Sequence, residues 1–259
     1  MPPFQFHGVV HLLPLPAAPR GSPGFAAVRD RALADAEVLA RGGATGIILE
    51  NFGDAPFARD AVDPHVVAAM AVLGAQLRAA HPGLTLGVNV LRNDARAALG
   101  IAAIVGARWV RINVLAGAAV TDQGLIQGDA HGWLRYRREL GAEGVGILAD
   151  VHVKHARPLA GGPIGEAAAD LAHRAGADVL IVTGRATGAA VDAADVDAVR
   201  AAAPDAPVWL GSGVSEASAR AWRQRVHGAI VGTALHRGGD VRAPLELARV
   251  QRMAEALLG

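Results

Sequence analysis

The chain has 259 residues, with 25 Lys and Arg against 24 Asp and Glu, and it contains no cysteine. A balanced charge without a basic stripe is atypical of nucleic-acid-binding proteins, so we expect no nucleic-acid partner. The lack of cysteine excludes disulfides, thiolate metal sites and cysteine nucleophiles. The proline-broken N-terminus lacks the basic region of a signal peptide, and no uncharged apolar run reaches the roughly 18 residues that span a bilayer. We therefore expect a cytoplasmic protein without a transmembrane segment and leave peripheral membrane association open.

Short runs rich in Val, Ile and Leu alternate along the chain with longer segments of helical period. The runs are continuously apolar, which is typical of strands buried on both faces. We expect eight strands, at Val9–Leu15, Gly46–Asn51, Leu84–Val90, Trp109–Val114, Val145–Val151, Val179–Gly184, Val208–Gly213 and Ala229–Ala234.

The segments between these runs carry apolar residues every three or four positions, as amphipathic helices do. One such face consists of Val28, Ala32, Ala36 and Leu39. A second face follows the helix-start pair Asp63-Pro64 and consists of Val66, Met70, Leu73 and Leu77. A last helix is expected to open at Pro244.

Eight strands that each precede a helix predict a single (β/α)8 barrel, a TIM barrel, over residues 1–259. The length fits, because such barrels have about 250 residues. A doubly wound open sheet is the rival architecture. The first strand is not followed by the Gly-x-Gly-x-x-Gly turn of dinucleotide-binding sheets, so we favour the closed barrel.

Glycines end the seventh and eighth predicted strands, where barrels of this kind hold phosphate groups. Glycine leaves backbone N–H groups uncovered, and the helix expected near Ser215 adds its positive end. Two Thr-Gly pairs after the sixth strand extend this surface. We therefore expect a phosphate site formed by Gly184, Gly211, Ser212, Gly213, Gly232 and Thr233.

Polar side chains gather at the ends of the first five strands. Glu50 can act as a general base, and Arg111, inside an apolar strand, needs a partner such as Glu50, Asp150 or a ligand anion. The expected catalytic residues are Glu50, Asn89, Arg111, Asp150 and Lys154. The expected substrate-binding residues are His11, Asn51, Asp54, Asn93, Asn113, Asp122, His152 and Thr183. For Asp54, and for Asn93 or Asp94, hydrogen bonding to loop or helix-start amides is the simpler alternative.

The fifth predicted strand leads into Asp150, His152 and Lys154, which share one face if the strand continues that far. A half-buried lysine can form a Schiff base with a carbonyl or act as a point charge on a phosphate. His11, Asp150 and His152 together are a weaker candidate for a divalent metal site, and no cofactor is otherwise indicated. The segment Leu115–His131 is the longest predicted loop and is expected to be a lid or binding loop.

Several strings resemble those of the BtpA/SgcQ family, and the resemblance runs from about residue 7 to the end. They are Gly8–Pro16, Glu50–Phe57, Gly87–Asp94, Thr121–Gly124, Ala149–Ala156 and Val182–Gly184. The family is similar to ribulose-phosphate-binding barrels. One branch is named for photosystem I biogenesis at the thylakoid surface, and another sits among sugar-phosphate genes. Histidine is not required at position 152 in the family, which weakens the metal hypothesis.

Three functions follow from these patterns. The first is an enzyme, an aldolase, isomerase or epimerase, that binds a phosphorylated small molecule such as a sugar phosphate. The second, which only the family resemblance implies, is a non-catalytic photosystem I assembly factor, and it predicts a large exposed apolar patch or a basic membrane-facing surface. The third is a metal-dependent hydrolase. We also expect the protein to form a homo-oligomer.

Overall fold

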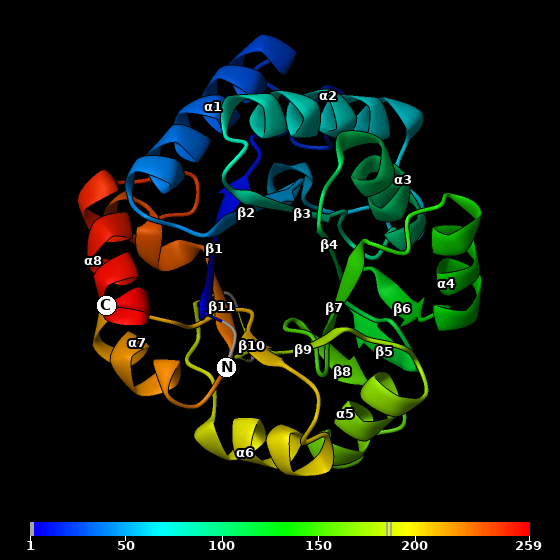
Figure 1. The fold of residues 1–259 in the computed structure, drawn as a ribbon. Helices are drawn as coiled ribbons and strands as arrows, with labels where there is room; N and C mark the ends of the chain where they lie inside the picture. The colour runs from blue at the N-terminus through cyan, green and yellow to red at the C-terminus, as the bar shows by residue number, and fades with distance from the viewer. Residues whose placement is uncertain (1–2, 185, 187) are drawn as a thin grey trace.

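The strands of the chain close into a parallel barrel in the computed structural model, which describes residues 3–184, 186 and 188–259. Eight strands of the described residues pair in the order β1-β11-β10-β9-β7-β4-β3-β2, with β2 returning to β1 (Figure 1). They are β1 (Gln5–His11), β2 (Gly46–Glu50), β3 (Thr85–Asn89), β4 (Trp109–Ile112), β7 (Gly146–Asp150), β9 (Val179–Val182), β10 (Val208–Leu210) and β11 (Gly228–Val231).

Helices form an outer ring, so that each barrel strand is followed by a helix before the next barrel strand begins (Figure 1). They are α1 (Phe25–Arg41), α2 (Pro64–Ala80), α3 (Ala95–Val105), α4 (Ala130–Glu139), α5 (Ile164–His173), α6 (Ala193–Ala202), α7 (Glu216–Arg223) and α8 (Leu247–Leu258). The expected (β/α)8 barrel is thereby confirmed.

The predicted apolar faces are the ones that the helices bury against the barrel. All four residues of the α1 face and all four of the α2 face are buried. A separate cluster fills the barrel interior, with Val9, Ile48, Leu148, Val179, Ile181, Trp209 and Ile230. Gly106 ends α3 with φ at 68°, in the left-handed region that glycine adopts without strain.

Several element boundaries differ from the expectation. The first strand spans Gln5–His11 instead of Val9–Leu15, because Pro14 and Pro16 cannot donate to a sheet and the earlier residues pair with β11. The last helix begins at Leu247, three residues after Pro244. The other barrel strands end one to three residues earlier than expected, because the last residues of each predicted run already belong to the strand-to-helix loops.

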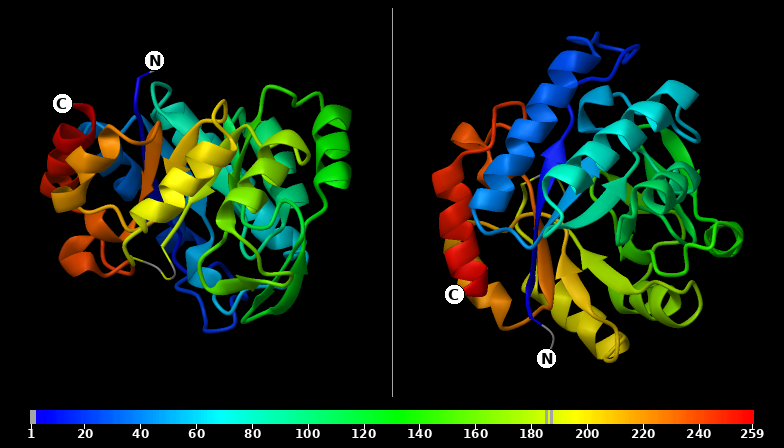
Figure 2. Two further views of the ribbon diagram at one scale, coloured as in Figure 1. Left: turned by 90° about the horizontal axis from the view of Figure 1, so that it is seen from below. Right: turned by 45° about the horizontal axis from the view of Figure 1, so that its top comes forward.

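The predicted long loop is largely a hairpin. Within Leu115–His131, β5 (Ala118–Thr121) pairs with β6 (Gly124–Gln127), and β8 (Ala156–Pro158) pairs with the other edge of β5. This small antiparallel sheet lies beside the end of the barrel from which the strand-to-helix loops emerge (Figure 2). The alternation of Ala119 and Ile126, which are buried, with Val120 and Leu125, which are exposed, explains why no buried strand was predicted there.

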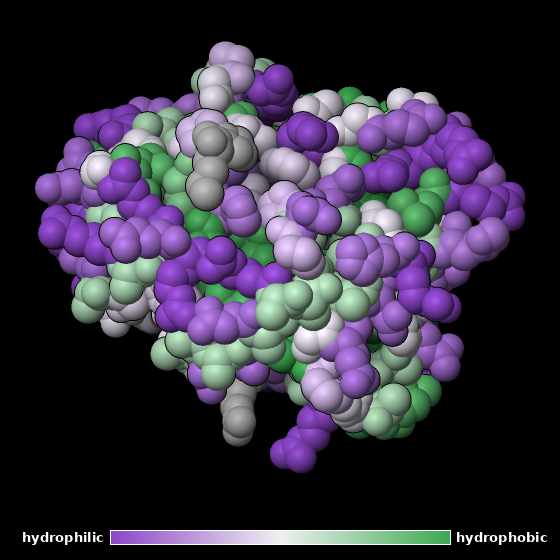
Figure 3. All heavy atoms as spheres, turned by 60° about the horizontal axis from the view of Figure 1, so that its bottom comes forward, coloured by the Kyte–Doolittle hydropathy of each residue, from purple (hydrophilic) through white to green (hydrophobic). Residues whose placement is uncertain are grey.

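The outer surface mixes polar and apolar residues. On the face drawn in Figure 3, hydrophilic side chains are interspersed with hydrophobic ones. Among the described residues, no helix has the length and apolar character needed to cross a bilayer.

Candidate active site

Three polar side chains stand at the ends of neighbouring strands. The strand register pairs His11 of β1 with Glu50 of β2, and Glu50 with Asn89 of β3. All three residues are buried, and His11 Nε2 lies 3.9 Å from Glu50 Oε1. Glu50 therefore stands between His11 and Asn89, because its strand pairs in parallel with both neighbouring strands.

Arg111 of β4 is paired with Asp150, the last residue of β7. The guanidinium donates from Nε and Nη2 to the two carboxylate oxygens at 3.0 and 3.1 Å. Asn113 donates a third hydrogen bond to the same carboxylate at 2.8 Å. Asp150 thus accepts three hydrogen bonds, which makes it a group that orients Arg111 and Asn113.

Lys154 follows β7 and is the only lysine in the sequence, beside 24 arginines (25 minus 1). Among the described residues, its ammonium group forms no ion pair. The carboxylate of Asp150 pairs with Arg111 instead. Burial and the charge of Arg111 lower the pKa of Lys154, and Glu50 and Asp150 only partly oppose this. At neutral pH a larger fraction of such an amine is unprotonated than of an ordinary lysine, and only the unprotonated amine acts as a nucleophile or general base.

Two cavities meet at these residues. The smaller one, of about 150 Å³, lies at the ends of β10 and β11. The larger one, of about 510 Å³, lies over β2, β3 and β4. Glu50, Arg111 and Lys154 line both of them. A ligand that fills both cavities therefore passes directly over these three side chains.

The smaller cavity contains most of the predicted phosphate residues. Gly211, Ser212, Gly213, Gly232 and Thr233 line it, together with Ser215, which caps α7. A Cβ at Gly232 would lie 2.7 Å from His11 Cε1, so only glycine lets β11 approach the histidine this closely.

Gly184, predicted as a sixth member, lies outside the lining of this cavity. Its N–H donates to Ser212 Oγ at 3.1 Å. The Ser212 hydroxyl proton therefore remains available for an anion, because the oxygen already accepts from Gly184. Thr183 also faces away, since its hydroxyl donates to the His152 carbonyl at 3.0 Å.

The larger cavity combines charge with aromatic surface. Phe52 and Phe57 line one part, and Arg92, Asn113 and Asp122 line another. Asp122 reaches the cavity from the turn between β5 and β6, so the hairpin forms part of the wall.

Two buried polar atoms at the larger cavity lack partners among the described residues. They are Oδ1 of Asn89 and Nε of Arg92. The other end of each side chain is fixed, because Asn89 donates to the Arg111 carbonyl at 3.0 Å and Arg92 donates to the Lys154 carbonyl at 2.7 Å. An unsatisfied buried donor and acceptor are costly unless a ligand or solvent meets them.

Three predicted substrate-binding residues hold loops together. Asn51 accepts from the Leu91 N–H at 2.7 Å and donates to Asp54 at 3.2 Å. Asp54 accepts from the Leu15 N–H at 2.8 Å. The side-chain amide of Asn93 donates to the Val114 carbonyl at 3.0 Å and accepts from the Val114 N–H at 2.9 Å. Asp94 caps α3 by accepting from the Ala97 N–H at 2.8 Å, in line with the simpler alternative.

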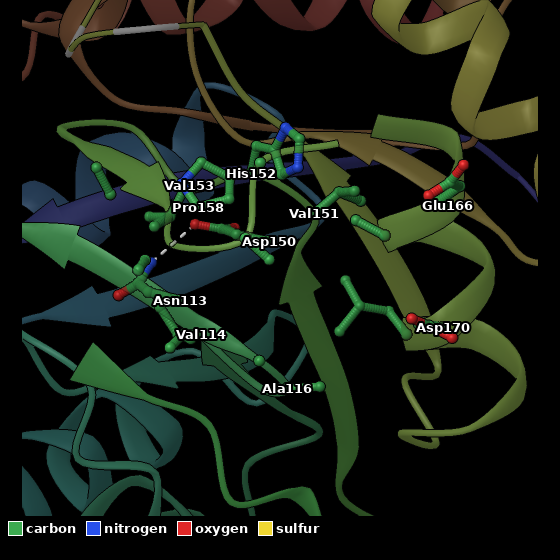
Figure 4. A pocket seen from close by; sticks show the side chains of 18 of the residues that line it. Asn113, Val114, Ala116, Asp150, Val151, His152, Val153, Pro158, Glu166 and Asp170 are labelled. Carbon is green, nitrogen blue, oxygen red and sulfur yellow. Dashed lines mark hydrogen bonds between the residues drawn. The ribbon is translucent and has the colours of Figure 1, made fainter. Parts of the chain in front are cut away.

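The shared face expected for Asp150, His152 and Lys154 does not form, because β7 ends at Asp150. His152 turns to a third cavity of about 300 Å³, between the small sheet and α5, where Glu166 also lies (Figure 4). Burial lowers the pKa of His152. Among the described residues, no group of three His, Asp or Glu side chains is placed to hold a metal ion. The predicted set of His11, Asp150 and His152 is therefore not assembled.

Two residues of the site escaped the sequence analysis. Arg92 stands beside the predicted Asn93, and its burial in a loop cannot be inferred from a short polar string. His236 is buried and its Nε2 lies 3.0 Å from His11 Nδ1, although the two are 225 positions apart. The single lysine was a usable signal that would have strengthened the choice of Lys154.

The fold and the site define a (β/α)8 barrel with a charged, two-part cleft at the C-terminal ends of its strands, the position of active sites in this architecture. The chain belongs to the BtpA family, whose model matches residues 5–258. The photosystem I biogenesis protein BtpA of Synechocystis is 46% identical over 98% of this chain and 89% of its own length. An uncharacterised protein of Thermococcus kodakarensis is 41% identical over 96% of this chain and 93% of its own length.

Solved structures of similar fold include two with distant sequences. A phosphoribosyl anthranilate isomerase from Thermus thermophilus has a TM-score of 0.58 at 12% identity, with 98% of each chain covered. The protein KGPDC from Streptococcus mutans has a TM-score of 0.60 at 12% identity, covering 98% of this chain and 97% of its own. At such identity the likeness shows the barrel fold alone.

Proposed function

We propose that this protein is an enzyme of the lyase or isomerase type that acts on a phosphorylated small molecule carrying a carbonyl group. The observation that carries the proposal is that Glu50, Arg111 and Lys154 line both the glycine-rich cavity and the larger cavity. A phosphate held in the first would place the rest of the substrate over these three side chains.

The smaller cavity suits a phosphate group. Its glycines expose backbone, Ser212 and Thr233 supply hydroxyl groups, and Arg111 supplies positive charge. The isomerase from Thermus thermophilus carries a phosphoribosyl group in its name, and it shares this fold. Both points favour a phosphorylated substrate.

Lys154 suits carbonyl chemistry. Its neutral amine would attack the carbonyl carbon, and loss of water would leave an iminium ion that draws electrons from a neighbouring C–C or C–H bond. Glu50, which lines the same two cavities, would take the proton released in that step. Arg111, oriented by Asp150, would stabilise negative charge on a substrate oxygen.

Borohydride reduction tests this chemistry directly, because the chain has one lysine. Phosphorylated sugars and keto acids are first screened for compounds that raise the melting temperature of the wild type. Each stabilising carbonyl compound is then incubated with borohydride, and the adduct is located by peptide mapping. We expect an adduct on Lys154 that Lys154→Arg abolishes. An adduct confined to the N-terminal amine, or none with any stabilising compound, contradicts a Schiff base.

Assembly of photosystem I is the second candidate, because the Synechocystis relative is named for that role. One observation favours an interaction surface: Val120 and Leu125 on the small sheet are 49% and 43% exposed, and Leu159, directly after β8, is 59% exposed. Val120 and Leu125 are direct cross-strand partners and so lie on one face. Under this function, Leu125→Ser would impair assembly while Lys154→Arg would not. The enzyme proposal predicts that Lys154→Arg removes activity and Leu125→Ser leaves it intact.

A further inference from the structure

Two buried histidines stand next to the smaller cavity. His11 ends β1, and His236 follows the short helix η2 (Thr233–Leu235) after β11. Nδ1 of His11 lies 3.0 Å from Nε2 of His236, and the ring centroids are 5.2 Å apart. The proposed chemistry gives His236 no role, yet its side chain is completely buried at the edge of the site.

The far nitrogen of His236 has a partner that can only accept. Its Nδ1 lies 2.6 Å from the carbonyl oxygen of Ala243. The guanidinium of Arg31 donates to the same carbonyl, and Asp35 holds Arg31 at 2.7 Å. Asp35 also accepts from the Leu245 N–H at 3.1 Å, which fixes the segment around Ala243. Since a carbonyl has no proton to give, Nδ1 of His236 must carry one.

The positions of the protons on both histidines follow from the hydrogen bond between His236 and Ala243. Burial lowers the pKa of both histidines, and for His11 the neighbouring His236, Lys154, Arg111 and Arg31 lower it further. A neutral imidazole has one N–H and one lone pair. The Nε2 of His236 is therefore an acceptor, and the Nδ1 of His11 is the donor to it. That leaves the Nε2 of His11 without a proton.

The unprotonated Nε2 of His11 faces the cleft. It lies 3.9 Å from Glu50 Oε1, and His11 and Glu50 both line the smaller cavity. We propose that His236 is a positioning residue that fixes the tautomer of His11, so that His11 presents the lone pair of Nε2 to the ligand beside Glu50. A histidine held by the hydrogen bond of its other nitrogen is the usual way in which proteins select one tautomer.

The tautomer also narrows the ligand class. With Nε2 of His11 and the Glu50 carboxylate both accepting, the ligand atom between them has to be a donor. A hydroxyl group next to the carbonyl of the substrate meets this requirement, and a carbonyl or ether oxygen does not. This consequence rests on the proposed function, whereas the tautomer itself does not.

Nitrogen NMR of the full chain labelled with 15N-histidine tests the tautomer at about neutral pH, where a neutral ring shows one protonated and one unprotonated nitrogen. His11→Gln assigns the His11 signals, because the chain has 10 histidines. We expect His11 with its proton on Nδ1 and none on Nε2. A proton on Nε2 of His11 overturns the proposal, whatever the enzyme does.

Variants of His236 test which residue sets the tautomer. His236→Phe removes the acceptor, and the Nδ1–H signal of His11 should weaken or vanish. His236→Gln keeps an amide oxygen within reach and should restore it, which a purely packing role would not require. His173→Phe, at an exposed position on α5, is the matched control. Unchanged His11 signals in His236→Phe, or no restoration by Gln, overturn the assignment. If His236→Phe does not fold, the Nδ1–H signal of His11 in the wild type and in His236→Gln still decides the assignment, and its absence from either spectrum overturns it.

Discussion

Arg111 and Asp150 form a buried ion pair in which both carboxylate oxygens accept, at 3.0 Å from Nε and 3.1 Å from Nη2. The pair matters for the cleft. Asp150 is the acidic residue closest in sequence to Lys154, and its carboxylate pairs with Arg111 instead of with the lysine. The pair holds Arg111 in place, and Glu50 and Lys154 line the same two cavities beside it.

The ion pair predicts non-additive stability changes. Arg111→Leu leaves the Asp150 carboxylate buried without its cation and should lower the free energy of unfolding by about 3–5 kcal/mol. Arg111→Leu combined with Asp150→Leu removes both charges and should recover a large part of that loss. Urea unfolding of the two single variants and the double variant measures the coupling. Additive losses would show that the pair does not act as a unit.

Lys154 should react as an amine with a lowered pKa. The rate of its acylation, followed by peptide mass, should titrate below the ordinary lysine value of 10.5, because burial and Arg111 disfavour the charged form. Glu50→Gln should lower the apparent pKa further, since the Glu50 charge now raises it. Titration of Lys154 at the ordinary lysine value, or an upward shift in Glu50→Gln, would contradict this electrostatic description.

His7 should make folding sensitive to acid. Its ring is fully buried against Trp209, neither ring nitrogen has a partner among the described residues, and burial lowers its pKa to about 3. Below pH 6.5, the unfolded chain binds a proton at this residue that the folded chain refuses. The free energy of unfolding therefore keeps its full value above pH 6.5. Between pH 6.5 and about 3 it falls by about 1.4 kcal/mol per pH unit.

His7→Leu tests this acid sensitivity. The free energy of unfolding, measured in urea at neutral and at mildly acidic pH, should fall less with acid in the variant. His65→Leu, at an exposed helix position, is the control and should keep the wild-type slope. An equal slope in His7→Leu would mean that His7 binds its proton in the folded state.

Much of the barrel could be predicted because continuous apolar runs and helical faces reflect burial, which decides the packing here. The sheet formed by β5, β6 and β8 could not, since Val120 and Leu125 point to solvent and leave only a weak alternation. The shift of β1 has a similar cause: Gln5 and His7 look polar, although His7 is buried.

For the site, the sequence predicts which residues stand at the end of a strand, but it does not predict the side chains with which they form hydrogen bonds. Glu50, Arg111 and Lys154 could be placed at the rim from sequence. That Asp150 accepts from both Arg111 and Asn113, or that His236 bonds His11 across 225 positions, depends on how distant segments meet. Short-range patterns carry no information about such contacts.

Phosphate in the smaller cavity is the central claim, and calorimetric titration tests it most directly. A stabilising phosphorylated compound and its dephosphorylated counterpart are compared on wild type, Thr233→Asp and Gln224→Glu. Thr233→Asp puts a negative charge into the cavity lining, whereas Gln224→Glu adds one at an exposed residue that ends α7, outside that lining. We expect Thr233→Asp to weaken binding of the phosphorylated compound by at least about tenfold, or about 1.4 kcal/mol, with Gln224→Glu near wild type. Equal affinity for both compounds, or equal binding by all three proteins, would contradict the claim.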